Sequence, residues 1–567
     1  MHMDTAGGDP ISALTARGAP FELMDVVVRG APARVFRNAP QSLSQLFRAA
    51  REHQARVFAV SEGVRLTYGE VFAAASALAA ELGTRGVTKG THVAIAMRNR
   101  PEWLIAFIAI SALGAVPVLV NSRGAAPELV HSLTYTRCGY VVADDERAGL
   151  MVAEPALAGI EGVKVGESLP APPRWRLYQD ILARPDVGEL PECICAPEDP
   201  AVIMFTSGTT GKAKGTVLDQ RGLLTALLAN QLSAAVGGVH LARRLGVDPD
   251  TLMTSGTQPC TLLVFPLFHT SGCLSVFLAN LMRGGKIVFL PRWSAAAALQ
   301  CVQAEHVSAL PAVPTMLWDL LHAPERHRYD TSSLLSLGTG GQGLPVNLLR
   351  AIREAFPHAV LGTGYGMTET NGMVTMLMGE EYEAHPSSAG RPLPTAEVHI
   401  LDDEGRRVPT GEVGEICVRS VQNMRGYWEC PEADAERVRE GWLLSGDLGR
   451  FDERGLLYIV SRKSDMVISG GENIYCAEVE HVLTMHPQVL EAVTFGVPDD
   501  RLGEKLVAAV VARPGADLEA LTLSEFCKIH LAAYKVPREW RFDRGPLERN
   551  VTGKLMKSQV RRRLWGH

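Results

Sequence analysis

The chain has 567 residues, which is too long for a single hydrophobic core, so we expect two or more domains. Hydrophobic residues make up 46% of it and charged residues 21%, and both values are ordinary for globular proteins. The formal net charge of −6 offers no basic surface that would attract nucleic acid, so no nucleic-acid partner is expected.

The cysteines and the apolar runs indicate a cytoplasmic protein with reduced thiols. The one close pair among ten scattered cysteines, Cys193 and Cys195, has no further Cys or His nearby to complete a metal site. The start of the chain lacks the apolar region of a secretory signal. Residues 104–120 form the strongest apolar run, but Gly114 and Pro117 divide it, and it is shorter than the roughly 20 residues of a membrane-spanning helix. We therefore expect no stable membrane insertion.

The first part of the chain predicts a layered α/β domain. Thr67 and Glu70 have the spacing of a capping box, and the alanine-rich run after them predicts a helix that ends at Gly83. Apolar strands and helices then alternate. The predicted strands cover 93–97, 115–120, 202–205, 286–290 and 358–366, and a helix covers 102–113. Such alternation is typical of parallel pairing with both sheet faces covered.

The pattern changes twice in the second part of the chain. From residue 396 short strands and turns predict a small β-rich lobe that closes the large domain. After residue 462 the pattern predicts a compact α+β unit, and we place the domain boundary at 462–466. In that unit the predicted helices lie near 477–485 and 524–533, and the predicted strands at 490–496 and 505–513.

A polar, glycine-rich stretch, TSGTTGKAKG at residues 206–215, follows a buried strand. Glycines allow a backbone to approach polyphosphate closely, and successive amides form an anion-binding nest. The spacing of Gly208, Gly211 and Lys212 differs from that of a Walker A loop, and Ala213 follows the lysine. Because α/β sheets bind ligands at the carboxyl ends of strands, the stretch predicts a phosphate-binding loop. The alternative is a flexible surface linker.

This stretch resembles the phosphate loop of the adenylate-forming superfamily, which includes acyl-CoA synthetases, adenylation domains and firefly luciferase. Ala213 stands where that family has proline. Four further motifs resemble those of the family and occur in its order between residues 40 and 567. They are GYGMTE at 364–369, SGD at 445–447, SRKSDMVISGGENIYCAEVE at 461–480 and NVTGKL at 550–555.

The resemblance implies a domain organisation. Residues 1–40 would be an N-terminal extension, and residues 41–462 an AMP-binding adenylation domain whose β-rich lobe covers about 396–462. Residues 463–567 would form a smaller, mobile α+β domain that carries the catalytic lysine. No carrier domain is expected, so the chain is expected to be a stand-alone enzyme.

The resemblance also implies a function, an ATP-dependent carboxylic acid:CoA ligase that forms an acyl-AMP intermediate and then a thioester. Its cofactors would be ATP, Mg²⁺ and CoA, and its partner a small carboxylic acid; homodimers are common in the family. Apolar residues 262–268 and the methionines of 373–378 favour a fatty or other hydrophobic acid.

Two alternatives stay open. One is a fatty-acyl-AMP ligase that delivers the acyl group to a carrier protein, because the segment 231–259 is longer than usual in this region. The other is a catalytically inactive protein that binds a nucleotide or acyl-AMP.

The reaction requires cations, because an anionic acid must approach the polyphosphate of ATP. By resemblance, Lys554 would supply one cation at the reacting phosphate. Mg²⁺ held by Glu369 and Thr210 would supply another at the leaving group. The Thr368 hydroxyl would bond the α-phosphate, and His269 would gate the acyl and thiol channels. The alternatives are a solvated lysine and a core histidine.

The nucleotide contacts are implied by the same motifs. Tyr365 would stack on adenine, and Asp447, on a tight turn, would accept the ribose hydroxyls beside Arg462. Thr363 stands where the family commonly has Asn or Gln, which leaves the contact to the adenine amine open. The remaining implied ATP/AMP-binding residues are Thr206, Ser207, Gly208, Thr209, Thr210, Gly211, Lys212, Gly341, Gly364, Gly366 and Met367.

The acyl and CoA sites are implied to lie among glycines. Gly338, Gly340 and Gly341 would leave room for the acyl chain beside a strand, next to His269. Ser464 lies at the hinge position of the family. Rotation about it would remove Lys554 and bring Gly470 and Gly471 to the CoA tunnel.

Overall fold

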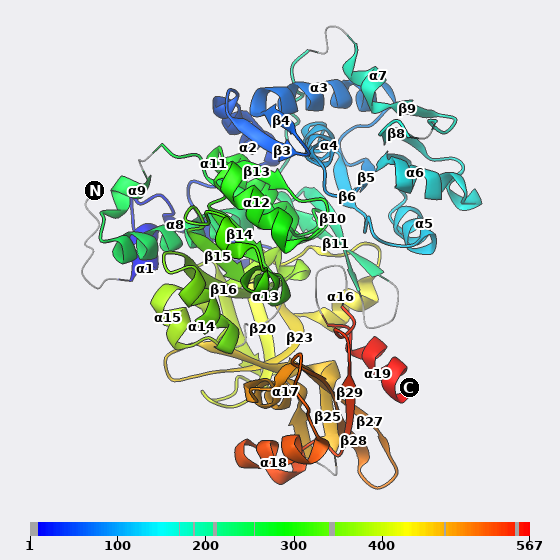
Figure 1. Ribbon diagram of the computed structural model, residues 1–567. Helices are drawn as coiled ribbons and strands as arrows, with labels where there is room; N and C mark the ends of the chain where they lie inside the picture. Colours follow the sequence, from blue (N-terminus) through cyan, green and yellow to red (C-terminus); the bar gives the residue numbers. More distant parts are fainter. Residues whose placement is uncertain are drawn as a thin grey trace.

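The computed structural model describes residues 9–168, 170–184, 188–207, 213–253, 256–339, 346–469, 472–549 and 555–566. Among them the strands form five sheets. The predicted mixed α/β fold is confirmed: a large N-terminal part contains most of the sheets, and a smaller C-terminal part, orange to red in Figure 1, lies at one end beside the yellow strands.

An eight-stranded sheet, in the order β21-β11-β10-β6-β5-β7-β8-β9, carries the predicted phosphate loop. Its strands from β5 to β10 pair in parallel, whereas β11 is antiparallel to β10 and β21 to β11. The strands are β5 (His92–Ala96), β6 (Val116–Leu119), β7 (Tyr140–Asp144), β8 (Glu161–Val165), β9 (Trp175–Leu177), β10 (Pro200–Ser207), β11 (Ala213–Asp219) and β21 (Gly426–Tyr427). Helix α3 (Tyr68–Thr84) precedes the first of these strands, and the helices between them are α4 (Pro101–Ala112), α5 (Ala126–Tyr135), α6 (Asp145–Val152) and α7 (Tyr178–Leu182).

A nine-stranded sheet, in the order β18-β17-β16-β15-β14-β12-β13-β3-β4, carries the GYGMTE motif at the end of β16. Its strands are β3 (Val57–Ser61), β4 (Val64–Thr67), β12 (Cys260–Leu263), β13 (Lys286–Phe289), β14 (Ala309–Ala312), β15 (Ser336–Thr339), β16 (Val360–Met367), β17 (Gly372–Met378) and β18 (Arg391–Pro392). The associated helices are α8 (Gln220–Leu245), α9 (Pro249–Met253), α10 (Thr270–Gly272), α11 (Ala279–Arg283), α12 (Ala295–Glu305), α13 (Pro314–His322), α14 (Val346–Ala355) and α15 (Gly379–Ala384).

Two smaller sheets follow, and the chain passes from one to the other between Arg462 and Met466. The first contains β19 (Ala396–Leu401), β20 (Gly414–Ser420), β22 (Val438–Arg439), β23 (Trp442–Phe451) and β24 (Leu457–Arg462), with α16 (Pro431–Arg437) beside it. The second contains β25 (Met466–Ser469), β26 (Glu472–Tyr475), β27 (Val489–Asp499), β28 (Gly503–Ala512) and β29 (Glu539–Asp543), with α17 (Cys476–Met485), α18 (Ala520–His530) and α19 (Lys557–Trp565).

The N-terminal residues are more ordered than the sequence predicted. The stretch expected to be an extension contains α1 (Pro10–Thr15) and an antiparallel hairpin, β1 (Leu23–Val28) and β2 (Ala31–Phe36). Helix α2 (Leu43–Ala50) follows the hairpin. Leu14 and Phe36 are almost fully buried in a cluster with α8 and β17, so the hairpin packs on the nine-stranded sheet side of the fold.

Local signals account for several elements. Thr67 accepts a hydrogen bond from the Glu70 amide at 3.2 Å, and the Glu70 carboxylate accepts one from the Thr67 amide at 2.7 Å, so the predicted capping box is confirmed. The apolar run at 104–120 forms α4 and β6, which are buried as predicted. Helix α18 begins and ends a few residues earlier than the predicted 524–533.

Helix α8 was not predicted from the sequence. In the described part of the chain it is the one helix whose length and apolar content would suffice to cross a membrane, and 61% of its most apolar window is buried within the fold. It ends at Gly246, whose φ of +67° suits a glycine C-cap. Residues 231–245 of the unusual 231–259 segment are therefore the second half of a core helix.

We predict that Thr67→Ala weakens the start of α3 and lowers the unfolding free energy of the large domain by about 1 kcal/mol, the usual cost of losing an N-cap. Chemical denaturation followed by circular dichroism measures this change. Thr84→Ala, in the last turn of the same helix, is the control, because the Thr84 hydroxyl bonds the Glu81 carbonyl and caps no amide at the start of the helix. Equal effects of the two substitutions would contradict the role of the cap.

Candidate functional site

The predicted phosphate loop connects two paired strands. In the register of β10 and β11, Thr206 faces Lys214 and Ser207 faces Ala213. The strands therefore bring the two ends of the loop together at the carboxyl end of β10. Gly208, Thr209, Thr210, Gly211 and Lys212 lie outside the described residues.

A line of contacts leads from this hairpin to the GYGMTE motif. The Lys214 ammonium lies over the Tyr427 ring, 5.4 Å from its centroid. The Tyr427 hydroxyl donates a hydrogen bond to Glu369 Oε1 at 2.8 Å. Burial, together with the Glu369 carboxylate, raises the pKa of Tyr427, so its phenol stays a donor. Glu369 itself is only 8% exposed.

Tyr427 is a site residue that sequence reasoning missed. It reaches Glu369 because β21 pairs with β11, which sets Tyr427 opposite Thr216. This pairing joins segments that are far apart in the chain. The residues GYW at 426–428 offered an aromatic in a turn-like context, but no signal of its own that pointed to the site.

A second line of contacts joins three residues predicted to bind the nucleoside. The Tyr365 hydroxyl donates a hydrogen bond to Asp447 Oδ2 at 2.8 Å, and Asp447 Oδ1 lies 3.4 Å from Arg462 Nε. Asp447 and Arg462 face each other across β23 and β24. Burial first, and then the Asp447 charge, raises the pKa of Tyr365 well above its usual value. The structure thus brings Tyr365, Asp447 and Arg462 together.

The local structure at Asp447 differs from the predicted tight turn. Asp447 lies within β23, in an irregular stretch where Ser445, Gly446 and Asp447 oppose the single residue Ile416 of β20. Gly446 has a φ of +74°, which favours glycine, and Ser445 Oγ accepts a hydrogen bond from the Asp447 amide at 3.0 Å. The turn chemistry that the sequence indicated is therefore present, but it forms a bulge in a strand.

The glycines of GYGMTE have a packing reason to be there. A Cβ atom on Gly366 would lie 1.8 Å from the Gly372 carbonyl oxygen, and one on Gly364 would lie 2.4 Å from the Met373 sulfur. Both glycines allow β17 to lie close to β16, its antiparallel neighbour in the sheet. Met367 follows in β16, and Thr368 then begins the short 3₁₀ turn Thr368–Thr370 that places Glu369.

The Thr363 side chain is engaged within the fold. Its hydroxyl is within hydrogen-bonding reach of the Tyr382 phenol, which is also 3.4 Å from the Thr339 hydroxyl. Thr363, which stands where the family commonly has Asn or Gln, therefore takes part in a polar contact between β15, β16 and α15.

The residues predicted near the acyl group lie on neighbouring segments. His269 is largely buried at the start of α10, and its Nε2 atom has no hydrogen-bond partner among the described residues. Burial, helped by nearby Arg123, lowers the pKa of His269 to about 4, so the ring is neutral at pH 7. Next to it, Thr270 Cβ would lie 3.9 Å from a Cβ atom on Gly372 of β17.

The predicted acyl-pocket glycines can be tested only in part. Among the described residues, the nearest atom to a Cβ atom on Gly338 of β15 would be Pro311 Cα, at 3.9 Å. With respect to these residues, the position has room for a methyl group. Gly340 and Gly341 lie outside the described residues.

The predicted hinge is tied to the bulge that holds Asp447. Ser464 lies in the 3₁₀ turn Lys463–Asp465 between β24 and β25. The Lys463 ammonium lies 2.8 Å from Asp403 and 3.3 Å from Glu415, whose other carboxylate oxygen accepts a hydrogen bond from the Gly446 amide at 3.0 Å. Gly470 and Gly471 lie outside the described residues.

Lys554 also lies outside the described residues, but both sides of its stretch are fixed. Arg549 and Leu555 form an isolated antiparallel bridge. Beyond it, Lys557 Nζ donates a hydrogen bond at 2.7 Å to Glu480, a half-buried residue of α17. The segment that includes Lys554 therefore begins and ends at one place in the C-terminal part.

Comparison with known proteins gives the family. A model of the AMP-binding enzyme family matches residues 46–428, and a model of the AMP-binding enzyme C-terminal domain matches residues 478–554. A 2-succinylbenzoate–CoA ligase of Geobacillus kaustophilus is 36% identical over 89% of this chain and 94% of its own length. The long-chain-fatty-acid–CoA ligase FadD13 of Mycobacterium tuberculosis is 31% identical over 88% of this chain and 93% of its own length.

Solved structures agree with the sequence relatives. The o-succinylbenzoate CoA synthetase of Bacillus subtilis with its acyl-adenylate intermediate has a TM-score of 0.74 and 30% identity, over 91% of this chain and 97% of that one. The same enzyme with ATP and a magnesium ion has a TM-score of 0.73 and 31% identity, over 91% of this chain and 98% of that one. The chain therefore belongs to the AMP-binding enzyme family, the adenylate-forming superfamily predicted from its motifs, and within it to the acyl-CoA ligases.

Proposed function

We propose that this protein is an ATP-dependent carboxylic acid:CoA ligase that forms an acyl-AMP intermediate and then an acyl-CoA thioester. One observation carries the proposal: two lines of contact, Lys214–Tyr427–Glu369 and Tyr365–Asp447–Arg462, converge from three sheets on the end of β16. A nucleotide whose phosphates lie at the β10–β11 loop would meet both lines.

The nucleoside would bind at the second line. Asp447 retains free lone pairs on both carboxylate oxygens, so it can accept hydrogen bonds from ribose hydroxyls while Tyr365 and Arg462 hold it in place. The Tyr365 ring would then lie beside the base. Tyr365 therefore has two roles here, as a surface for adenine and as the donor that orients Asp447.

The residues present fit a magnesium ion that is shared with phosphate. Glu369 is buried, and the hydrogen bond that its carboxylate accepts from Tyr427 uses only the Oε1 oxygen. Among the described residues no group of three or more His, Cys, Asp or Glu side chains could hold a metal by itself. Mg²⁺ typically takes one or two carboxylates and completes its shell with water and substrate phosphates. Glu369, with Thr210, would hold it there and so neutralise the leaving pyrophosphate.

The chemistry divides into two steps. The acid's carboxylate oxygen attacks the α-phosphorus of ATP, forming acyl-AMP while pyrophosphate leaves; Lys554 and Thr368 would stabilise charge on the α-phosphate. The CoA thiol then loses its proton and attacks the acyl carbonyl, and AMP leaves. A rotation about Ser464 would separate the two steps. The contacts Lys463–Glu415 and Glu415–Gly446 join this hinge to the nucleotide site.

The acid is proposed to be hydrophobic, although the methionines of 373–378 no longer support this. Met376 is 5% exposed and packs with Leu232 and Val236 of α8, in a cluster that Met373 and Met378 border. They fill the core. Two observations still support a hydrophobic acid. Gly338 leaves room beside β15, and the His269 ring is neutral, so it adds no positive charge to the proposed acyl site. A cytoplasmic location and a homodimer stay predictions.

The function is tested by incubating the protein with ATP, Mg²⁺ and a panel of aliphatic and aromatic acids, with and without CoA. We expect pyrophosphate release with at least one hydrophobic acid, and acyl-CoA when CoA is present. Acyl-AMP that accumulates without a thioester would favour delivery to a carrier protein. Absence of pyrophosphate with every acid would contradict the ligase and favour a binding protein.

We predict that Lys554→Ala lowers the rate of acyl-AMP synthesis by at least about 100-fold, because it removes the cation at the reacting phosphate. Thioester formation from supplied acyl-AMP should largely survive, since Lys554 would have left the site in that step. Quenched-flow measurement of each half-reaction checks this. Lys528→Ala, at an exposed lysine in the same domain, is the control. Equal losses in both half-reactions would refute the division of labour.

We also predict that Asp447→Ala raises the KM for ATP by about tenfold or more, because the ribose loses a charged acceptor. Tyr365→Phe keeps the carboxylate and removes only the hydrogen bond at 2.8 Å, so its effect on the KM should be smaller. Steady-state kinetics with varied ATP measures both. An unchanged KM in Asp447→Ala would remove Asp447 from the ribose.

A further inference from the structure

The strand that follows the phosphate loop has an edge that its neighbour covers only in part. Strand β11 pairs with β10 along its length, but with β21 only at Thr216 and Val217. Just before this pairing, the Gly215 carbonyl still accepts a hydrogen bond from the Trp428 amide at 2.7 Å. Carbonyls two residues apart in a strand point to the same side. The Ala213 carbonyl therefore lies on the same edge, beyond the end of β21.

A histidine of helix α5 supplies the partner for this carbonyl. His131 is half-buried, and its Nε2 atom lies 2.9 Å from the Ala213 oxygen. Because a carbonyl oxygen only accepts hydrogen bonds, Nε2 carries the proton and is the donor. The bond ties Ala213, the first described residue after the loop, to a helix of the sheet that carries the loop (Figure 1).

Helix and strand match in spacing at this contact. His131 and Tyr135 are four residues apart in α5, which is about 6 Å along the helix axis. Ala213 and Gly215 are two residues apart in β11, which is about 7 Å along the strand. The His131 and Tyr135 rings stack with their centroids 5.4 Å apart, and a Cβ atom on Gly215 would lie 3.5 Å from Tyr135 Cε1. Two side chains of α5 therefore dock on this end of β11.

We propose that His131 is a positioning residue of the nucleotide site, which holds the carboxyl end of the phosphate loop. Ala213 stands where the family has proline. A proline ring fixes φ near −65°, whereas alanine allows a wider range of φ. The hydrogen bond from His131 restrains the same residue through its carbonyl, so it replaces part of that restraint. The proposal rests on the proposed function, because it assigns the loop to ATP.

The same anchor bears on the contacts that lead to Glu369. Successive side chains of a strand point to opposite faces. Since Gly215 faces Tyr135, the Lys214 side chain lies on the other face, where its ammonium is 5.4 Å from the centroid of the Tyr427 ring. A shift of β11 at its first residue would therefore move both the loop and Lys214.

Calorimetric titration with MgATP, in the absence of any acid, tests the binding part of the inference without the reaction. We expect His131→Leu to weaken MgATP binding by about fivefold, which corresponds to the loss of one hydrogen bond between neutral groups. His131→Gln should bind nearly as tightly as the native protein, because the glutamine amide can present its Nε2 donor to the same carbonyl. Unchanged binding in His131→Leu would overturn the proposal.

The matched control is His92→Leu. His92 Nδ1 is likewise bonded to a backbone carbonyl, that of Thr136 at 2.7 Å, so this variant removes an equivalent bond at the far end of α5. We expect it to keep the native affinity for MgATP. Unfolding midpoints show whether each variant is folded. An equal loss of affinity in His92→Leu and His131→Leu would reduce His131 to a general packing contribution and contradict the assignment.

Ala213→Pro provides a rescue that a purely structural role would not show. An amide and a carbonyl of one residue point to the same side of an antiparallel strand, so proline at this position would remove no bond to β10. We expect Ala213→Pro to bring MgATP binding in His131→Leu back to within about twofold of the native value, and to change it little in the native background. Losses from the two substitutions that add together would argue against one restraint replacing the other.

The two half-reactions separate this inference from the proposed function. In His131→Leu we expect the KM for ATP in pyrophosphate release to rise by about fivefold. Thioester formation from supplied acyl-AMP should be largely unchanged, because acyl-AMP has a single phosphate. If no acid leads to pyrophosphate release, the ligase is refuted, but the MgATP titrations still decide the role of His131. Equal losses in both half-reactions, or a native protein that binds no MgATP, would overturn the inference.

Discussion

The position of the Asp447 carboxylate is the constraint on which the arrangement of the site depends. A charge this well buried needs partners, and the described residues supply a phenol from the nine-stranded sheet and a guanidinium from β24. Arg462 is the last residue before the chain passes to the C-terminal sheet. The Asp447 carboxylate, which we propose binds the ribose, is therefore paired with a residue next to the hinge about which the C-terminal part would rotate. Glu415 adds a second connection between them, through Lys463 and the Gly446 amide.

The sequence best predicted those features that depend on residues close together in the chain. The capping box at Thr67 and the alternation of strands and helices depend on neighbouring residues, and the structure confirms both. Motif order predicted the family for the same reason. At Asp447 the predicted tight turn is a bulge within β23. Tyr427 was missed because its role arises from the pairing of β21 with β11, which no local pattern encodes. The methionines of β17 were wrongly taken as support for a hydrophobic acid, because a flexible apolar side chain suits a binding pocket and a protein core equally.

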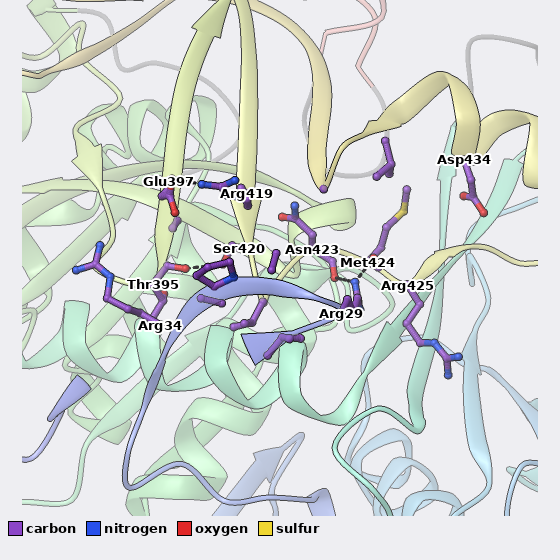
Figure 2. A pocket seen from close by; sticks show the side chains of 18 of the residues that line it. Arg29, Arg34, Thr395, Glu397, Arg419, Ser420, Asn423, Met424, Arg425 and Asp434 are labelled. Carbon is purple, nitrogen blue, oxygen red and sulfur yellow. Dashed lines mark hydrogen bonds and ion pairs between the residues drawn. The ribbon is translucent and has the colours of Figure 1, made fainter. Parts of the chain in front are cut away.

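Long-range packing also explains the other surprises. The N-terminal hairpin is stable because Leu14 and Phe36 are buried against α8, a helix that the sequence did not reveal. Three glycines interrupt the pattern of α8, which obscures its helical periodicity, and one of them, Gly237, is in close contact with Met378. The tip of the hairpin in turn contacts the segment before β21, where Arg29 donates hydrogen bonds to the Asn423 and Met424 carbonyls (Figure 2). The N-terminal residues, which were predicted to be only an extension, are therefore connected to Glu369, the residue proposed to hold magnesium. Arg29 bonds the Met424 carbonyl, and the Met424 amide bonds the Glu369 carbonyl.

The close antiparallel pairing of β16 and β17 has a consequence for laboratory evolution of acid selectivity. At Gly366 even a methyl group would collide with the Gly372 carbonyl, so a mutant library randomised there would yield mostly misfolded clones. Gly338, by contrast, has space for a methyl group. Engineers who wish to shorten or reshape the substrates accepted should diversify β15 and leave the GYGMTE glycines untouched.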